Sequence, residues 1–208
     1  MRLLVLDAAL SRCLAALVED GVVLAERIAE GAHGQAAALP PLAETVLAET
    51  RMIDAIAVGV GPGSFTGLRS AIALAQGLAA ARGIPLVAVT TGEALAATTP
   101  PGMPVWAATE NRRGQLFLEC FDADGLALAG PAVLAEADLR QPAAQTRIVG
   151  DGAPRAAARM AARGWTVGLG DARQIEAPGL AAAALRRLAG ALAPLAIEPL
   201  YIDTPATT

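Results

Sequence analysis

A glycine-rich segment and an isolated acidic residue are the parts of this sequence best suited to chemistry. Gly61, Gly63 and Gly67 follow an apolar run and precede a long stretch of helix-forming residues. Glycine permits tight turns, and free backbone amides at the start of a helix attract anions, so this loop could hold a phosphate. Asp7 ends the first apolar run, where its carboxylate could coordinate magnesium.

The spacing of the glycines differs from that of the common phosphate-binding loops. It reads G-x-G-x-x-x-G, one residue longer than the dinucleotide fingerprint, and Leu68 and Arg69 follow Gly67 where a Walker A loop has Lys and Ser or Thr. A structural strand-to-helix turn is the other interpretation, with Ser64 or Thr66 capping the helix, and the spacing favours it. The predicted glycine loop consists of Gly61, Pro62, Gly63, Ser64, Phe65 and Gly67.

Several residue types needed for catalysis are scarce in this chain. All sixteen basic residues are arginine, which excludes a Schiff-base lysine and a phosphate-loop lysine. His33 is the single histidine, so a His-rich metal site cannot be built. A serine hydrolase needs a base beside its serine, and one histidine in the chain argues against this role for Ser64. These scarcities argue against lysine-based and serine-hydrolase chemistry.

The composition is that of a folded α/β protein with a sparsely charged surface. The 208 residues are 54% hydrophobic and 17% charged, with a net charge of −4, which argues against a strong non-specific hold on nucleic acid. Cys13 and Cys120 are distant from each other, which favours reduced thiols and a cytoplasmic location. Glycine and proline interrupt every long apolar run, so we expect no membrane-spanning segment.

The order of predicted elements suggests a duplicated α/β fold with mixed sheets. Residues 1–98 read as three strands followed by alternating helices and strands, and residues 103–208 read as a shorter version of the same order, with a linker at 98–102. The predicted strands are 3–6, 13–18, 22–28, 53–60, 86–89, 105–109, 115–121, 147–149 and 199–202, and the predicted helices are 35–49, 66–81, 154–163 and 181–192.

The predicted helix 66–81 carries a row of small residues. Gly67, Ala71, Ala75 and Ala79 recur every four positions, which places them on one face where another element could approach closely. This face packs either on the chain's own sheet or on a partner helix. Because the helix is apolar almost all round, it has more than one face to cover.

The segment VGPGSFTGLR at 60–69 resembles the signature of TsaB (YeaZ-type) proteins. The first strand at 4–7, the segment GIPLV at 83–87, RRGQLF at 112–117, GDGA at 150–153 and EPLYI at 198–202 extend the resemblance over most of the chain. The family consists of accessory subunits of bacterial tRNA threonylcarbamoyladenosine (t6A) synthesis. The resemblance implies an ASKHA fold, related to actin, Hsp70, sugar kinases and ribonuclease H, with two related lobes of mixed sheets flanked by helices.

The resemblance also implies a role and partners. It predicts a non-catalytic scaffold that binds and activates the paralogue TsaD, which modifies adenosine 37 in tRNAs that read ANN codons, together with the ATPase TsaE. ATP and metal are then expected on the partners and none in the isolated chain. A homodimer is expected when the chain is alone, and contact with tRNA is expected to be indirect.

By the same resemblance, the first two helices form the partner interface. Substitutions Ala75→Glu and Gly77→Arg are accordingly expected to leave the monomer folded and to abolish the complex. The predicted interface residues are Leu39, Leu42 and Val46 on the first helix, and Thr66, Ser70, Ala71, Leu74, Ala75 and Leu78 on the second.

The sequence departs from the ASKHA enzymes and from the family in several places. Asp7 is followed by Ala8-Ala9-Leu10 in place of a glycine and an early hydroxyl, so Asp7, Gly150 and Gly152 resemble a vestigial nucleotide site. Asp203 replaces the usual arginine, and Arg112 with Arg113 forms either a tRNA-phosphate contact or a solvated turn. The alternative function is an ATP-binding small-molecule kinase or ATP hydrolase of the same fold.

Overall fold

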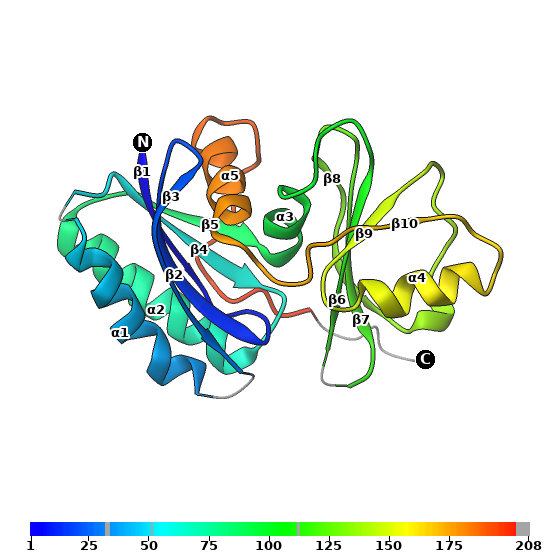
Figure 1. Ribbon diagram of the computed structural model, residues 1–208, viewed down its shortest axis with the longest axis horizontal. Helices are drawn as coiled ribbons and strands as arrows, with labels where there is room; N and C mark the ends of the chain where they lie inside the picture. Colours follow the sequence, from blue (N-terminus) through cyan, green and yellow to red (C-terminus); the bar gives the residue numbers. More distant parts are fainter. Residues whose placement is uncertain (32–33, 51, 112, 203–208) are drawn as a thin grey trace.

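The first part of the chain folds around a five-stranded mixed sheet, shown in a computed structural model that describes residues 1–31, 34–50, 52–111 and 113–202 (Figure 1). The strand order is β3-β2-β1-β4-β5, in which β1 pairs antiparallel with β2 and parallel with β4. The strands are β1 (Arg2–Asp7), β2 (Arg12–Glu19), β3 (Val22–Glu30), β4 (Ala55–Gly61) and β5 (Leu86–Thr90).

The second sheet repeats this topology. Its order is β10-β9-β6-β7-β8, so β6 takes the central place that β1 has in the first sheet, with an antiparallel neighbour on one side and a parallel one on the other. The prediction of two related lobes of mixed sheets is confirmed. The strands are β6 (Val105–Glu110), β7 (Leu116–Phe121), β8 (Ala127–Leu134), β9 (Arg147–Val149) and β10 (Gly168–Leu169).

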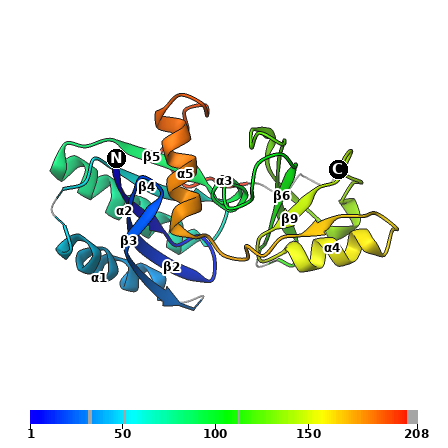
Figure 2. The same cartoon turned by 45° about the horizontal axis from the view of Figure 1, so that its top comes forward.

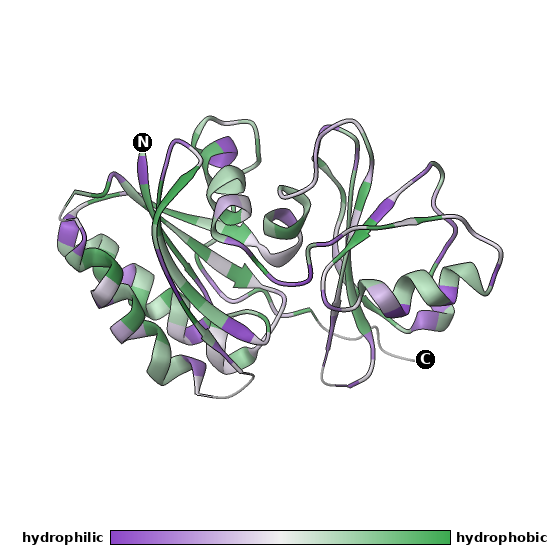
Figure 3. Cartoon of the chain, in the orientation of Figure 1, coloured by the Kyte–Doolittle hydropathy of each residue, from purple (hydrophilic) through white to green (hydrophobic). Residues whose placement is uncertain are grey.

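Helices cover both faces of the first sheet, which Figures 1 and 2 show from two directions. α1 (Gln35–Ala48) and α2 (Phe65–Arg82) lie on one face, and α3 (Thr91–Ala96) and α5 (Ala177–Leu188) lie on the other. The central strands are therefore apolar on both sides, as their green colour in Figure 3 indicates. α4 (Ala153–Ala161) and a 3-10 turn, η1 (Glu136–Asp138), belong to the second lobe.

The C-terminal part of the chain returns to the first lobe. α5 packs against α3 and the strands of the first sheet, and Leu195 and Ile197 pack beside the α1–α2 layer. The predicted second-lobe range of 103–208 is therefore too long, because apolar alanines in α5 complete the core of the first sheet. None of the described helices has both the length and the hydropathy needed to cross a membrane.

Several local predictions need correction. Residues 199–202 form no strand, because the chain there runs beside α2 and has one backbone bond to β4, from Leu200 N–H to the Val60 carbonyl at 2.8 Å, besides a local bond from Tyr201 N–H to the Pro199 carbonyl at 3.1 Å. β8, β10 and α3 were not predicted, since they are short or rich in alanine and glycine. α5 begins and ends about four residues before the predicted helix 181–192, with Pro178 in its first turn.

Candidate functional site

The glycine loop packs against the turn between β1 and β2. The backbone N–H of Ser64 donates to the Ala9 carbonyl at 2.7 Å, and Gln35 Nε2 donates to the Leu10 carbonyl at 2.6 Å. A Cβ atom at Gly63 would collide with the Ala9 carbonyl, and one at Gly67 would collide with the neighbouring Ala8 carbonyl. The glycines thus allow two backbone segments to touch, which supports the structural interpretation of this loop.

Ser64 begins α2 and serves as its cap. Its backbone lies outside the helical region, and its hydroxyl accepts a hydrogen bond from the Gly67 N–H at 3.3 Å. The predicted cap is confirmed. Within the described residues Ser64 has no titratable base as a hydrogen-bond partner.

Gly67→Ala is expected to destabilise the protein by about 1–3 kcal/mol, because the added methyl group meets rigid backbone atoms of Ala8. Urea unfolding measures the change. Gly77→Ala in the same helix is the control, since a Cβ there meets nothing within 4 Å and should stabilise the helix by up to about 1 kcal/mol. Equal stability of the Gly67 and Gly77 variants would contradict the packing of the loop.

Asp7 lies at the end of β1 but does not point to an open site. It is 1% exposed, and its Oδ2 accepts a hydrogen bond from the Ala9 N–H at 3.1 Å. Its Oδ1 has no hydrogen-bond partner among the described residues and lies where a Cβ at Gly59 would collide with it. Burial raises the pKa of Asp7 to about 6. A carboxylate so enclosed does not fit a magnesium-nucleotide centre.

A cleft of about 640 Å³ separates the two lobes beside the glycine loop. The first lobe contributes the β1–β2 turn and the start of α2, and the second lobe contributes Glu110, Arg113 and Asp151. Burial raises the pKa of Asp151, whose Oδ1 accepts a hydrogen bond from the Glu110 N–H at 2.9 Å. Glu110 pairs with Arg155 at 3.1 Å, so the charged groups of the cleft are of both signs.

Gly150 and Gly152 form the turn between β9 and α4 and lie against β6. The Gly152 N–H donates to the Ala108 carbonyl at 3.1 Å, and a Cβ at Gly150 would collide with that carbonyl. These glycines repeat in the second lobe the close packing of the glycine loop in the first. The structure does not bring them together with Asp7 in one pocket, since neither the cleft nor the other pockets contain that set.

The predicted small-residue row of α2 is sealed inside the subunit. Ala71 and Ala75 are 0% exposed and pack in the layer between α2 and the first sheet. Leu39 and Val46 of α1 are equally buried in that layer. Their assignment to a partner interface is wrong, because a helix on a sheet must bury one face and small residues let α2 approach β4 closely.

The opposite face of α2 is exposed and also small. We call Thr66, Ala73, Gly77 and Ala80, with the half-buried Ser70, the outer face of α2. Between Arg69 and Arg82 the helix has no charged residue, and nothing lies within 4 Å of a Cβ built at Gly77. Three predicted interface residues, Leu42 of α1 with Leu74 and Leu78 of α2, are half-buried against the core between these helices and the sheet. Two predicted interface residues, Thr66 and Ser70, lie on this outer face, whereas Ala71 and Ala75 lie on the buried side.

A buried polar cluster joins the two lobes. Glu119 of β7 is 4% exposed and accepts a hydrogen bond from the Thr90 hydroxyl at 2.8 Å. Thr90 caps α3, whose Glu93 pairs with Arg187 of α5 at 2.5 Å. Burial raises the pKa of Glu119 to about 8, with a further increase from Glu93 and a decrease from Arg187. Sequence analysis missed this cluster, since one acidic residue in a strand normally faces solvent.

Glu119→Gln is expected to make stability less dependent on pH. A folded-state pKa of about 8, above the ordinary value of 4.5, means that folding favours the protonated acid. The contribution of the protonated Glu119 to the free energy of unfolding is complete below pH 4.5 and is lost as the pH rises through 8. Between these limits the free energy of unfolding falls by about 1 kcal/mol per pH unit. The stability of the Glu119→Gln variant relative to the wild type should therefore increase from pH 5 to pH 8.

Urea unfolding at several pH values measures this difference. Glu44→Gln, on the exposed side of α1, is the matched control and should track the wild type. A constant difference between the Glu119 variant and the wild type across this range would contradict a neutral, buried Glu119.

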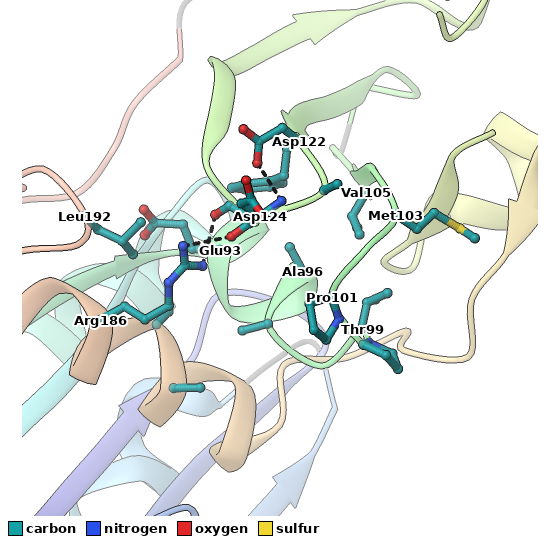
Figure 4. Close-up of a pocket in the computed structure, with 17 residues that line it drawn as sticks. Glu93, Ala96, Thr99, Pro101, Met103, Val105, Asp122, Asp124, Arg186 and Leu192 are labelled. Carbon is teal, nitrogen blue, oxygen red and sulfur yellow. Dashed lines mark hydrogen bonds between the residues drawn. The ribbon is translucent and has the colours of Figure 1, made fainter. Parts of the chain in front are cut away.

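A second pocket, of about 320 Å³, lies between α3, α5 and the turn after β7 (Figure 4). Its walls are largely apolar, with Ala96, Val105 and Leu192 among them. Arg186 points toward the turn and donates to the carbonyl oxygens of Asp124 and Gly125 at 2.9 and 3.1 Å. These contacts join α5 to the second lobe, and no predicted site residue lines this pocket.

Of the remaining candidate residues, Arg113 lies in the described part of the chain. Arg113 is exposed at the mouth of the cleft, whereas His33, Arg112 and Asp203 lie outside the described residues. Among the residues that the structure describes, no group of three or more His, Cys, Asp or Glu side chains is arranged to hold a metal ion.

The duplicated sheets and the cleft between them define an ASKHA-type protein, in which the β1–β2 turn is covered by the glycine loop. A comparison with solved structures agrees. YeaZ from Pseudomonas aeruginosa is 28% identical with a TM-score of 0.78, and the alignment covers 97% of this chain and 99% of that chain.

A family model described as TsaD, tRNA N6-adenosine threonylcarbamoyltransferase, matches residues 23–192, so the chain belongs to this family. Within it the chain is TsaB/YeaZ-like. TsaB of Escherichia coli (strain K12) is 38% identical over 96 residues, which are 44% of this chain and 41% of that protein. An uncharacterized protein of Mycobacterium tuberculosis (strain H37Rv) is 36% identical over 142 residues, or 65% of this chain. The chain spans 66% of the length of that mycobacterial relative.

Proposed function

We propose that this chain is a non-catalytic scaffold subunit that binds and activates a TsaD-type paralogue in t6A synthesis on tRNA. The observation that carries the proposal is the outer face of α2, an exposed and uncharged row of small residues on an 18-residue helix. A surface without long side chains lets a partner helix approach closely, and its burial removes apolar area from water. The partner interface would bury on the order of 1,600 Å² in total.

The relatives support the pathway. The Escherichia coli relative is named a tRNA threonylcarbamoyladenosine biosynthesis protein, and the family model carries the name of the threonylcarbamoyltransferase. We extend this to adenosine 37 of tRNAs that read ANN codons. The outer face of α2 would bind the TsaD-type subunit in the complex and a second copy of the chain when that subunit is absent.

The enclosed Asp7 and the covered β1–β2 turn support a role without catalysis. The Ser64 N–H of the glycine loop donates its hydrogen bond to the Ala9 carbonyl, and Asp7 faces Gly59. Neither the Ser64 amide nor the Asp7 carboxylate is therefore available to a nucleotide in the cleft. In this proposal ATP and metal bind the TsaD-type and TsaE-type partners, tRNA is reached through the TsaD-type subunit, and the assembly works in the cytoplasm.

Co-purification tests the scaffold role. The tagged chain, produced together with the TsaD paralogue of the same genome, should elute with it from a size-exclusion column at micromolar concentration. Deletion of the gene should remove t6A from tRNA digests analysed by mass spectrometry, and the wild-type gene should restore it. Separate elution with unchanged t6A would contradict the proposal.

The alternative function is an ATP-binding kinase or ATP hydrolase, and the observation that supports it is the 640 Å³ cleft between the lobes. Isothermal titration with Mg-ATP separates the two functions. The scaffold proposal predicts no binding to the isolated chain at micromolar concentration, whereas low-micromolar affinity with turnover would favour the enzyme.

A further inference from the structure

Arg69 is held in a fixed orientation on the exposed side of α2. Its guanidinium carbon lies 3.9 Å from the centre of the Phe65 ring and 5.7 Å from that of the Tyr201 ring. Its Nε donates a hydrogen bond to the Tyr201 hydroxyl at 2.7 Å. Both rings lie within the range of a cation–π interaction, so an exposed arginine that would ordinarily move freely is restrained here by three contacts.

The two aromatic rings are themselves fixed yet uncovered. Phe65 is 55% exposed and Tyr201 is 51% exposed, and the rings stack with centroids 5.4 Å apart. Two hydrogen bonds hold the segment that carries Tyr201 against the first lobe. Leu200 N–H donates to the Val60 carbonyl, and Gln76 Nε2 donates to the Ile197 carbonyl at 3.1 Å. These side chains are therefore largely ordered before a partner binds, which reduces the conformational entropy that binding would remove.

The terminal nitrogens of Arg69 remain available. In the described part of the chain neither Nη1 nor Nη2 donates a hydrogen bond, while Nε is already used. The two terminal amino groups form a planar fork that matches the two oxygens of a carboxylate. Thr66 and Ser70, which flank Arg69 on the helix, are small and neutral, so a partner can reach this fork from the outer face of α2.

We propose that Phe65, Arg69 and Tyr201 form a preorganised clamp for a carboxylate of the protein that docks on the outer face of α2. This inference rests on the proposed function and adds the chemistry of the partner: an aspartate or glutamate beside the docking helix. Arginine and tyrosine are among the residues that contribute most binding energy in protein interfaces, where the contact removes them from water.

A protein carboxylate fits this clamp better than an RNA phosphate. An RNA site needs several cations along a strand, whereas Arg69 is the single cation of the clamp. The neighbouring cleft contains Glu110 and Asp151 with one arginine, Arg113, and the chain has a net charge of −4. This balance disfavours an extended phosphate backbone, with many negative charges, more than it disfavours a single carboxylate at Arg69.

Titration of the TsaD paralogue against the full-length chain tests the clamp. Arg69→Gln should weaken binding about tenfold or more, because it removes the charge and the fork. Arg69→Lys should recover only part of this loss, since it restores the charge without the planar fork. Tyr201→Phe keeps the ring, removes the acceptor for Nε, and should weaken binding about threefold. Arg159→Gln, at an exposed arginine of α4 in the second lobe, is the control and should bind like the wild type.

The outcomes separate the two proposals. If the wild type binds and Arg69→Gln binds equally well, docking on α2 stands and the clamp is wrong. If Arg69→Gln weakens binding of an anticodon stem-loop RNA and leaves affinity for the paralogue unchanged, the clamp serves RNA and this inference is overturned. Absence of wild-type binding to the paralogue would overturn both proposals. Unchanged melting temperatures would show that the variants remain folded.

Discussion

Gly77→Arg is expected to abolish binding of the TsaD paralogue while leaving the monomer folded. Gly77 lies at the middle of the outer face of α2, and a Cβ built there meets no atom within 4 Å. Arginine also forms helix better than glycine, so the monomer should lose no stability. In the complex, a long charged side chain would stand where a partner helix must approach, and we expect an affinity loss of about 100-fold or more.

Size-exclusion chromatography and titration with the paralogue measure this effect. Gly77→Ala keeps the surface small and should bind like the wild type. Ala161→Arg adds the same charge to the exposed side of α4 in the second lobe and should also bind normally. Tight binding by the Gly77→Arg protein would place the interface elsewhere on the molecule.

Ala75→Glu is expected to unfold the protein or to destabilise it by more than about 4 kcal/mol. Ala75 is 0% exposed in the layer between α2 and the first sheet, where the surrounding side chains are apolar. A glutamate there must either ionise without a partner or push α2 away from β4, and both are costly. The expectation from sequence, that this variant leaves the monomer folded, is therefore revised.

Ala73→Glu is the matched control for this prediction. It introduces the same side chain two positions earlier, on the exposed side of the same helix. Circular dichroism should show a folded Ala73 variant with a melting temperature close to that of the wild type, and a strongly destabilised Ala75 variant. A cooperative transition of Ala75→Glu within a few degrees of the wild type would mean that α2 packs with a different face inward.

The two-lobed fold followed from the sequence because its elements are strongly patterned. Apolar runs such as residues 3–6 and 55–60 indicate strands covered on both sides, and the glycine loop marks the junction of a strand and a helix. The repeat of this order after residue 103 predicted the second lobe. The short β10 and α3 carry too little pattern to be found in this way.

The proposed partner surface on α2 shows the limit of interpreting a helix from its sequence. α2 has small residues on nearly every side, so periodicity placed Ala71 and Ala75 on one face but could not tell which face meets the sheet. The neighbouring strands decide this. β1 and β4 bury the Ala71 side, and the Ala73 and Gly77 side is left to solvent.

Sequence alone determined that there are two related lobes, the glycine loop and the family resemblance, because these depend on local pattern and on the order of elements along the chain. Tertiary structure decided which side of α2 is free, that Asp7 is enclosed, and that Tyr201 lies against Arg69, 132 residues away. These features depend on contacts between segments far apart in the chain, which no local periodicity records. The clamp of Phe65, Arg69 and Tyr201 exists only because the C-terminal segment returns across the first lobe.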